Sequence, residues 1–102
     1  MRRDRNVKND EWPFDQRPNC AVITLKTVIS REVPILFVSR DEDDQSWQFP
    51  TGEIVRKNDA AVVALHEIVE LDPSVLELAD LPPGWIAKRR SENAAWEKQA
   101  RR

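Results

Sequence analysis

Histidine and cysteine, which serve most often in nucleophilic catalysis and in zinc sites, are scarce in this chain of 102 residues. His66 is its single histidine and Cys20 its single cysteine, so a zinc site built from several imidazoles or thiolates is excluded. A nucleophilic Cys–His pair would require the fold to bring two residues together that are far apart in sequence. Because a free cysteine usually behaves as a small buried apolar residue, we expect no such pair.

Two carboxylates, those of Glu67 and Glu70, lie on one predicted helix. The segment WQFPTGEI, with Gly52, precedes AAVVALHEIVEL, with Glu67 and Glu70. This spacing resembles the Nudix box, whose glutamates hold the divalent cations that bridge a diphosphate. Four positions of the box are occupied by other residue types: Asn58, His66, Leu71 and Pro73. These departures remove most of the charge that would hold Mg²⁺. We therefore expect no catalytic residue, metal or cofactor. The alternative prediction is a divergent Nudix-type, Mg-dependent hydrolase that uses Glu67 and Glu70.

Charge is distributed unevenly along the chain. Residues 32–80 hold 12 acids and 3 bases, a net of −9, whereas residues 1–31 carry +3 and residues 81–102 carry +4. The run Asp41-Glu42-Asp43-Asp44 predicts a surface loop, since adjacent like charges need solvent. It lacks the spacing of a calcium loop. We interpret this run as a solvated loop, with a partner-binding surface for a basic protein, formed by the same four acids and Trp47, as the alternative hypothesis.

Other partner classes are disfavoured. The sequence pI is about 5.4, and the acidic middle of the chain would repel phosphate, which argues against nucleic acid. The longest uninterrupted apolar run is Ala60–Leu65, far too short to span a membrane. No secretory signal is recognisable after the first arginines, and we expect a cytoplasmic protein.

The apolar patterning predicts an α+β fold with a small antiparallel sheet packed against one main helix and one short helix. We expect an opening hairpin, a third short strand, a main helix capped by Asn58 or Asp59, a short helix that begins at Asp72-Pro73, and a late returning strand. The predicted strands are 20–30, 33–40, 47–49 and 85–87, and the predicted helices are 58–71, 72–79 and 92–102.

The same patterning predicts three segments. Residues 1–19 are expected to form a flexible charged arm, residues 20–90 a single α+β domain, and residues 91–102 a charged helical segment. Within the arm, the cluster Trp12-Pro13-Phe14 is expected to dock on the core, because isolated exposed aromatic residues are uncommon.

Motifs across residues 20–99 are similar to a bacterial immunity-protein-like family of polymorphic toxin systems, formerly a domain of unknown function. The matching pieces are CAVITLKTVISREVPILFVSR, DDQSWQFPTGEI, ALHEIVELDPSVLEL and LADLPPGWIAKR, followed by a late tryptophan. The motif positions, expected to be structural, are Trp47, Phe49, Gly52, Asp72, Pro73, Leu81, Pro82, Gly84, Trp85 and Trp96. The resemblance implies a small cytoplasmic α+β protein that neutralises a toxin by binding it, with no catalytic residue and no cofactor.

Overall fold

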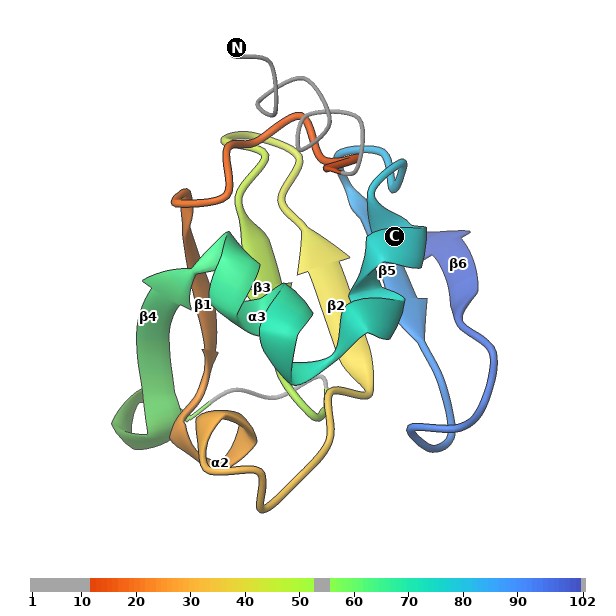
Figure 1. The fold of residues 1–102 in the computed structure, drawn as a ribbon. Helices are drawn as coiled ribbons and strands as arrows, with labels where there is room; N and C mark the ends of the chain where they lie inside the picture. The colour runs from red at the N-terminus through yellow and green to blue at the C-terminus, as the bar shows by residue number, and fades with distance from the viewer. Residues whose placement is uncertain (1–11, 53–55, 102) are drawn as a thin grey trace, which may run out of the picture.

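A computed structural model describes residues 12–52 and 56–101. Within these residues, six strands form one mixed sheet in the order β4-β1-β3-β2-β5-β6. The strands are β1 (Ala21–Leu25), β2 (Phe37–Arg40), β3 (Trp47–Phe49), β4 (Ala60–Ala64), β5 (Trp85–Lys88) and β6 (Glu97–Ala100). The helical elements are α2 (Lys26–Ile29), η1 (Lys57–Asp59), α3 (Leu65–Leu71) and η2 (Pro73–Leu78). Figure 1 shows α3 and η2 on one face of the sheet. The α+β class is confirmed.

The predicted opening hairpin is wrong. β1 ends at Leu25 because the chain turns into α2, where the Ser30 N–H donates to the Lys26 carbonyl at 2.9 Å. β3 then lies between β1 and β2, and pairs parallel with β1 and antiparallel with β2. The sheet is therefore mixed rather than antiparallel. The helical turn α2 ends the β-branched run that begins with β1. As a result β1 and β2, which the sequence pattern predicts to be neighbours, are not paired.

The predicted start of the main helix is also wrong. Ala60–Ala64 forms β4, which pairs antiparallel with β1 over five residue pairs. The apolar residues of this segment fit the period of a helix as well as that of a strand. They form a strand because the outer edge of β1 supplies backbone hydrogen-bond partners that an isolated helical turn would lack. α3 begins only at Leu65, and the Glu67 carboxylate accepts a hydrogen bond from the Ala64 N–H at 3.0 Å.

The Asp72-Pro73 prediction is confirmed. The Asp72 carboxylate accepts from the Ser74 N–H at 3.0 Å, and Pro73 occupies the first position of η2. The returning strand is present as β5. The predicted C-terminal helix is wrong, because residues 97–100 form β6, which pairs antiparallel with β5. The charged C-terminal segment is thus an edge strand of the sheet.

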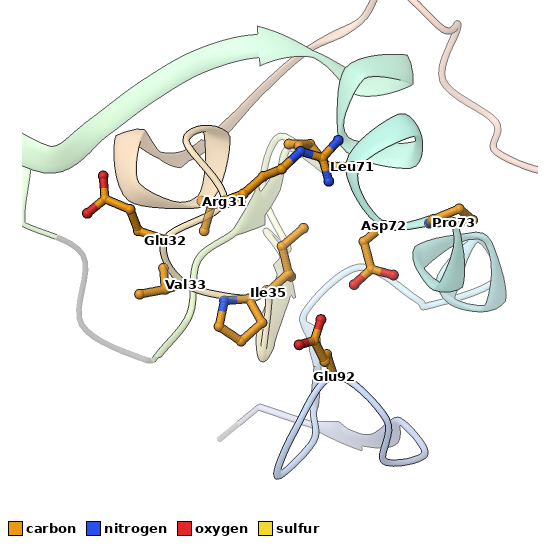
Figure 2. Close-up of a pocket in the computed structure, with 10 residues that line it drawn as sticks. Arg31, Glu32, Val33, Ile35, Leu71, Asp72, Pro73 and Glu92 are labelled. Carbon is orange, nitrogen blue, oxygen red and sulfur yellow. The ribbon is translucent and has the colours of Figure 1, made fainter.

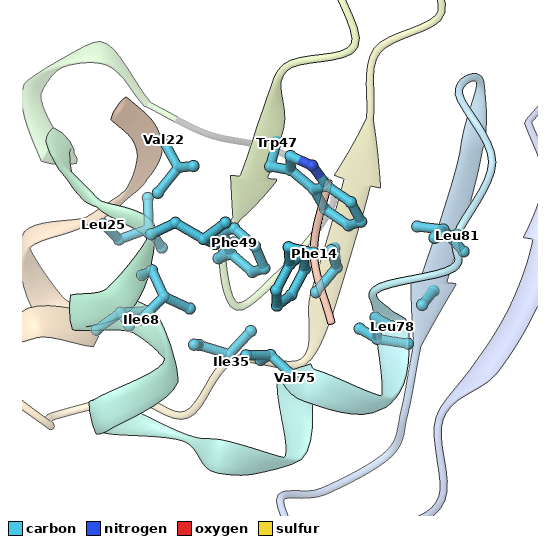
Figure 3. Close-up of a cluster of buried hydrophobic side chains, with 14 residues drawn as sticks. Phe14, Val22, Leu25, Ile35, Trp47, Phe49, Ile68, Val75, Leu78 and Leu81 are labelled. Carbon is cyan, nitrogen blue, oxygen red and sulfur yellow. The ribbon is translucent and has the colours of Figure 1, made fainter. Parts of the chain in front are cut away.

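The core lies between the sheet and the elements α3 and η2 (Figure 3). Phe14 contributes to it with 5% of its surface exposed, and its ring meets Trp47 edge-on with centroids 5.4 Å apart. The Trp47 indole N–H donates to the Gln16 side-chain carbonyl at 3.1 Å. The predicted docking of the Trp12–Phe14 cluster is confirmed, so residues 12–19 pack on the domain instead of forming a free arm. The rest of the predicted arm, residues 1–11, lies outside the described residues.

Among the described residues, no helix has both the length and the apolar character needed to cross a bilayer.

Candidate protein-binding site

The acidic run lies in the loop between β2 and β3, and its backbone is fixed by its own side chains. The Asp41 carboxylate accepts from the N–H groups of Asp43, at 2.7 Å, and of Asp44, at 3.3 Å. The Asp41 N–H donates to the Ser46 carbonyl at 2.8 Å, which closes the loop. All four acids are exposed. The backbone of the loop therefore has a defined conformation, from which the charged side chains project into solvent.

A glycine turn supports this loop from the start of β5. The Gly84 N–H donates to the Arg40 carbonyl at 2.7 Å. Gly84 has a φ of +83°, and a Cβ at this position would lie 3.4 Å from the Glu42 Cβ. The left-handed backbone favours a glycine here, and an added Cβ would be in van der Waals contact with Glu42. This motif position thus helps to position the acidic loop.

Three of the acids, Asp41, Glu42 and Asp43, line a hollow of about 480 Å³. Its other lining residues are Phe37, Ser39, Arg40, Gln48, Pro50, Gly84 and Arg101. Because side chains alternate along a strand and Val38 and Trp47 point into the core, Ser39 and Gln48 point to the opposite face of the sheet. We call this site, with its three carboxylates at the rim, the acidic hollow.

The acidic hollow is suited to a basic side chain. Three acidic residues and two basic ones, Arg40 and Arg101, are among the residues that line it, and the backbone N–H of Arg101 donates to the Gly84 carbonyl at 3.0 Å. Ser39 and Gln48 add uncharged polar groups to its wall. Carboxylates at a concave surface attract cations and pair with guanidinium or ammonium groups. A lysine or arginine side chain of a partner protein is the ligand that this chemistry favours.

Asp44 remains ionised at the end of the loop. A hydrogen bond from the Ser46 N–H, at 3.0 Å, stabilises its carboxylate and lowers the pKa of this group from its ordinary value, with a further contribution from the Ser46 hydroxyl. The side chain is fully exposed, so this charge is presented to solvent and to any approaching partner.

Trp47 does not contact partners as predicted. Its side chain is 1% exposed, and it stacks on Phe49 with centroids 5.9 Å apart. The Arg40 guanidinium lies over its ring at 5.1 Å, donates to the Leu81 carbonyl at 2.8 Å and reaches the Gln45 amide oxygen at 3.2 Å. The docked Phe14, whose ring meets Trp47 edge-on, contributes to this burial. Trp47 is instead part of the support beneath the loop.

A buried arginine explains three of the other motif positions. Arg89 uses all five of its N–H donors, two of them on the Ile35 carbonyl and the others on Asp72, Ser74 and the Glu92 carbonyl. Trp96 covers its guanidinium at 4.1 Å. Pro73 lies between the acceptors Asp72 and Ser74. The cluster ties η2, β5 and the segment before β6 together. Arg89 was missed because it stands within an otherwise exposed run of bases.

The remaining motif positions are structural. Phe49 and Leu81 are fully buried, Trp85 packs at the margin of the core, and the Trp85 N–H donates to the Pro82 carbonyl at 3.1 Å. Gly52 lies in the bend after β3, and a Cβ added to it would meet nothing within 4 Å. These roles agree with the structural interpretation of the motif.

A second hollow, of about 260 Å³, lies between η2 and the segment that joins α2 to β2. Figure 2 shows the carboxylates of Asp72 and Glu92 turned toward the same space, with Ile35 beside them and Arg31 near Leu71. The charge of Asp72 is already paired with Arg89. This hollow therefore offers less free charge to a partner than the acidic hollow does.

The two glutamates of the Nudix-like segment have other contacts. Glu67 accepts from the Ala64 N–H, and Glu70 lies 3.1 Å from His66 Nδ1. Both glutamates are exposed. In residues 12–52 and 56–101, no three His, Cys, Asp or Glu side chains gather closely enough to hold a metal ion. Glu53, which could have supplied a third carboxylate, lies outside these ranges.

No protein-family model, curated protein or solved structure matches the chain.

Proposed function

We propose that this chain is a non-enzymatic protein-binding factor whose acidic hollow receives a lysine or arginine side chain of a basic partner. The observation that carries the proposal is the convergence of Asp41, Glu42 and Asp43 on one hollow of about 480 Å³. The loop is held by hydrogen bonds in the unbound chain, so little ordering accompanies binding.

Ion pairs within the chain neutralise some of its acids but leave those of the acidic loop exposed. Of the bases near the C-terminus, Arg89 is bound to Asp72, and Lys98 donates to Asp80 at 2.8 Å. These bases neutralise acids on the helical side of the molecule and do not reach the loop. The loop acids therefore keep most of their charge for a partner, with Arg40 and Arg101 as the basic residues among those that line the hollow.

An immunity-like role is the specific form of this proposal. The resemblance of residues 20–99 to the immunity-protein-like family favours a toxin domain as the partner. A nuclease-type toxin needs a basic surface to hold phosphate, and an acidic loop covers such a surface while it accelerates association. In this proposal the encounter takes place in the cytoplasm, where a single free cysteine such as Cys20 stays reduced.

Binding to a panel of purified basic toxin domains tests the proposal. We expect at least one domain to bind, with an affinity that falls as the salt concentration rises, because salt screens the loop carboxylates from the partner's bases. Titration calorimetry at increasing NaCl concentrations measures this. Absence of binding to every domain, or an affinity that salt leaves unchanged, would overturn the proposal.

A further inference from the structure

The acidic hollow contains residues of both signs of charge. Beside its three acids it is lined by two basic residues, Arg40 and Arg101. The guanidinium of Arg40 is not free for a ligand, because it lies over the Trp47 ring on the core side of the sheet and donates to the Leu81 carbonyl. Arg101 is therefore the base left to contact a molecule in the hollow.

The side chain of Arg101 projects from the same face of the sheet as the hollow. Trp85, which packs against the core, pairs with Ala100, so these two side chains lie on the core face. Arg101 continues this ladder by one residue, since its N–H donates to the Gly84 carbonyl. Because side chains alternate along a strand, Arg101 projects from the opposite face, which is the face where the hollow lies.

Opposite charges lie near each other at the hollow without being paired. Gly84, the backbone partner of Arg101, is also the residue that Glu42 approaches, since a Cβ added to this glycine would lie 3.4 Å from the Glu42 Cβ. In the described part of the chain, however, neither Arg101 nor any of the loop acids takes part in an ion pair. Both signs of charge are therefore open to the charged groups of a ligand.

The hollow also offers apolar surface. Phe37 and Pro50 line it, together with the uncharged polar residues Ser39 and Gln48. Aliphatic stems such as those of lysine and arginine lie along apolar surface of this kind while their charged ends stay in contact with polar groups. The volume of about 480 Å³ is within the range of pockets that hold small ligands. The hollow thus suits an aliphatic chain that is cationic at one end and anionic at the other.

We propose that the acidic hollow receives the C-terminal residue of its partner, a lysine or arginine whose free α-carboxylate pairs with Arg101. The cationic end of that side chain pairs with Glu42 and Asp43, so a single residue satisfies both signs of charge. A base from the middle of a chain would leave Arg101 without an anion and would bring a second positive charge close to it. This inference rests on the proposed function, because it names which base of the partner enters the hollow.

A pair of tripeptides tests the role of the carboxylate. Acetylated glycyl-glycyl-arginine with a free C-terminus and the same peptide with a C-terminal amide differ only in this charge. We expect the free acid to bind about threefold more tightly than the amide, because it alone pairs with Arg101. An NMR titration of the Ser39 and Gln48 amides, with millimolar peptide at low salt, measures both affinities.

Substitutions separate the role of Arg101 from that of the acids. Arg101→Gln removes the preference for the free acid, so that the two peptides bind equally. Glu42→Gln weakens both peptides and keeps the preference, since the guanidinium of either peptide loses the same partner. Arg90→Gln, which removes an exposed base that does not line the hollow, is the control and leaves the preference unchanged. Circular dichroism checks that each variant is folded.

The outcomes distinguish this inference from the proposed function. Equal binding of the two peptides to the unmodified chain would overturn the inference, and so would a preference that survives Arg101→Gln. Tighter binding of both peptides by the same factor in Arg101→Gln would also overturn it, because Arg101 would then act only as a competitor for the acids. Failure of both peptides to bind would overturn the inference as well, and the proposed function falls with it only if no basic toxin domain binds.

Discussion

At the scale of single residues, burial decides which charges matter to the fold. Arg89 and Lys98 both pair with an acid, but the Arg89 side chain is 1% exposed, whereas Asp80, the partner of Lys98, is 80% exposed. A buried charge left without its partner is costly, while an exposed pair contributes little. These two bases lie in the same C-terminal region of the sequence and have very different roles.

Replacing Arg89 tests this difference. Arg89→Met removes the donors to Asp72 Oδ2 and to the Ile35 carbonyl, and we expect it to lower the free energy of unfolding by about 3–5 kcal/mol. Lys98→Met, the control, is expected to cost about 0–1 kcal/mol. Urea unfolding followed by tryptophan fluorescence measures both. Equal losses in the two variants would contradict the role of Arg89 as a buried anchor.

The pKa of Asp44 gives a second prediction at this scale. The Ser46 N–H holds this pKa below its ordinary value, so the folded state binds a proton less readily than the unfolded state does. The resulting stabilisation is present above the unfolded pKa and is lost as pH falls through the folded pKa. A carboxyl-detected NMR titration should show a lower midpoint for Asp44 in the folded chain than in urea. Equal midpoints would mean that the loop hydrogen bond does not form.

At the scale of elements, turns and strand order position the site. The acidic loop is placed by β2 and β3 at its two ends and by the Gly84 turn behind it. Each support comes from a different part of the chain: the strands from residues 37–49 and the turn from residues 82–85. The loop is therefore attached to the two central strands of the sheet.

Substitution of the two glycines separates a constrained turn from an unconstrained bend. Gly84→Ala forces a side chain into a left-handed backbone and toward Glu42, and we expect a cost of about 1–2 kcal/mol. Gly52→Ala, the control, meets open space and is expected to be close to neutral. Thermal unfolding measures both, and a neutral Gly84→Ala would contradict the support of the loop by this turn.

Local signals explain which elements could be predicted. The Asp72-Pro73 cap, the Trp47–Phe49 strand and the returning strand at Trp85 depend on short-range chemistry, and all three are present in the structure. Ala60–Ala64 was assigned to a helix because its apolar residues also fit a helical stripe. It forms a strand because it pairs with β1, which lies 35 or more residues earlier in the chain. Such long-range pairing leaves no mark in a local pattern.

The candidate site was predictable in part for the same reason. Four consecutive acids identify an exposed loop without any knowledge of the fold. The hollow beside them, its Gly84 support and the approach of Arg101 require the positions of β2, β5 and β6. Trp47 was assigned to the partner surface because it follows the acids closely, yet the docked Phe14 covers it.

At the scale of the whole molecule, some charges of the described residues form ion pairs that hold elements together, and others are exposed to solvent. Asp72 and Asp80, on either side of η2, pair with Arg89 and Lys98, whereas the acids of the β2–β3 loop remain exposed at the end of the sheet. The result is one concave acidic surface over β2 and β3 and one apolar edge at β4. We interpret the first as the surface for a basic partner.

The most direct test of the central proposal compares two pairs of neutralised acids in binding to the panel of basic toxin domains. Glu42→Gln with Asp43→Asn removes two charges from the acidic hollow, and Glu77→Gln with Glu97→Gln removes two exposed charges elsewhere. At low salt we predict that the first pair weakens the affinity measured by calorimetry on the order of tenfold. The second pair should change it by less than about twofold. Equal effects of the two pairs would contradict binding through the acidic hollow.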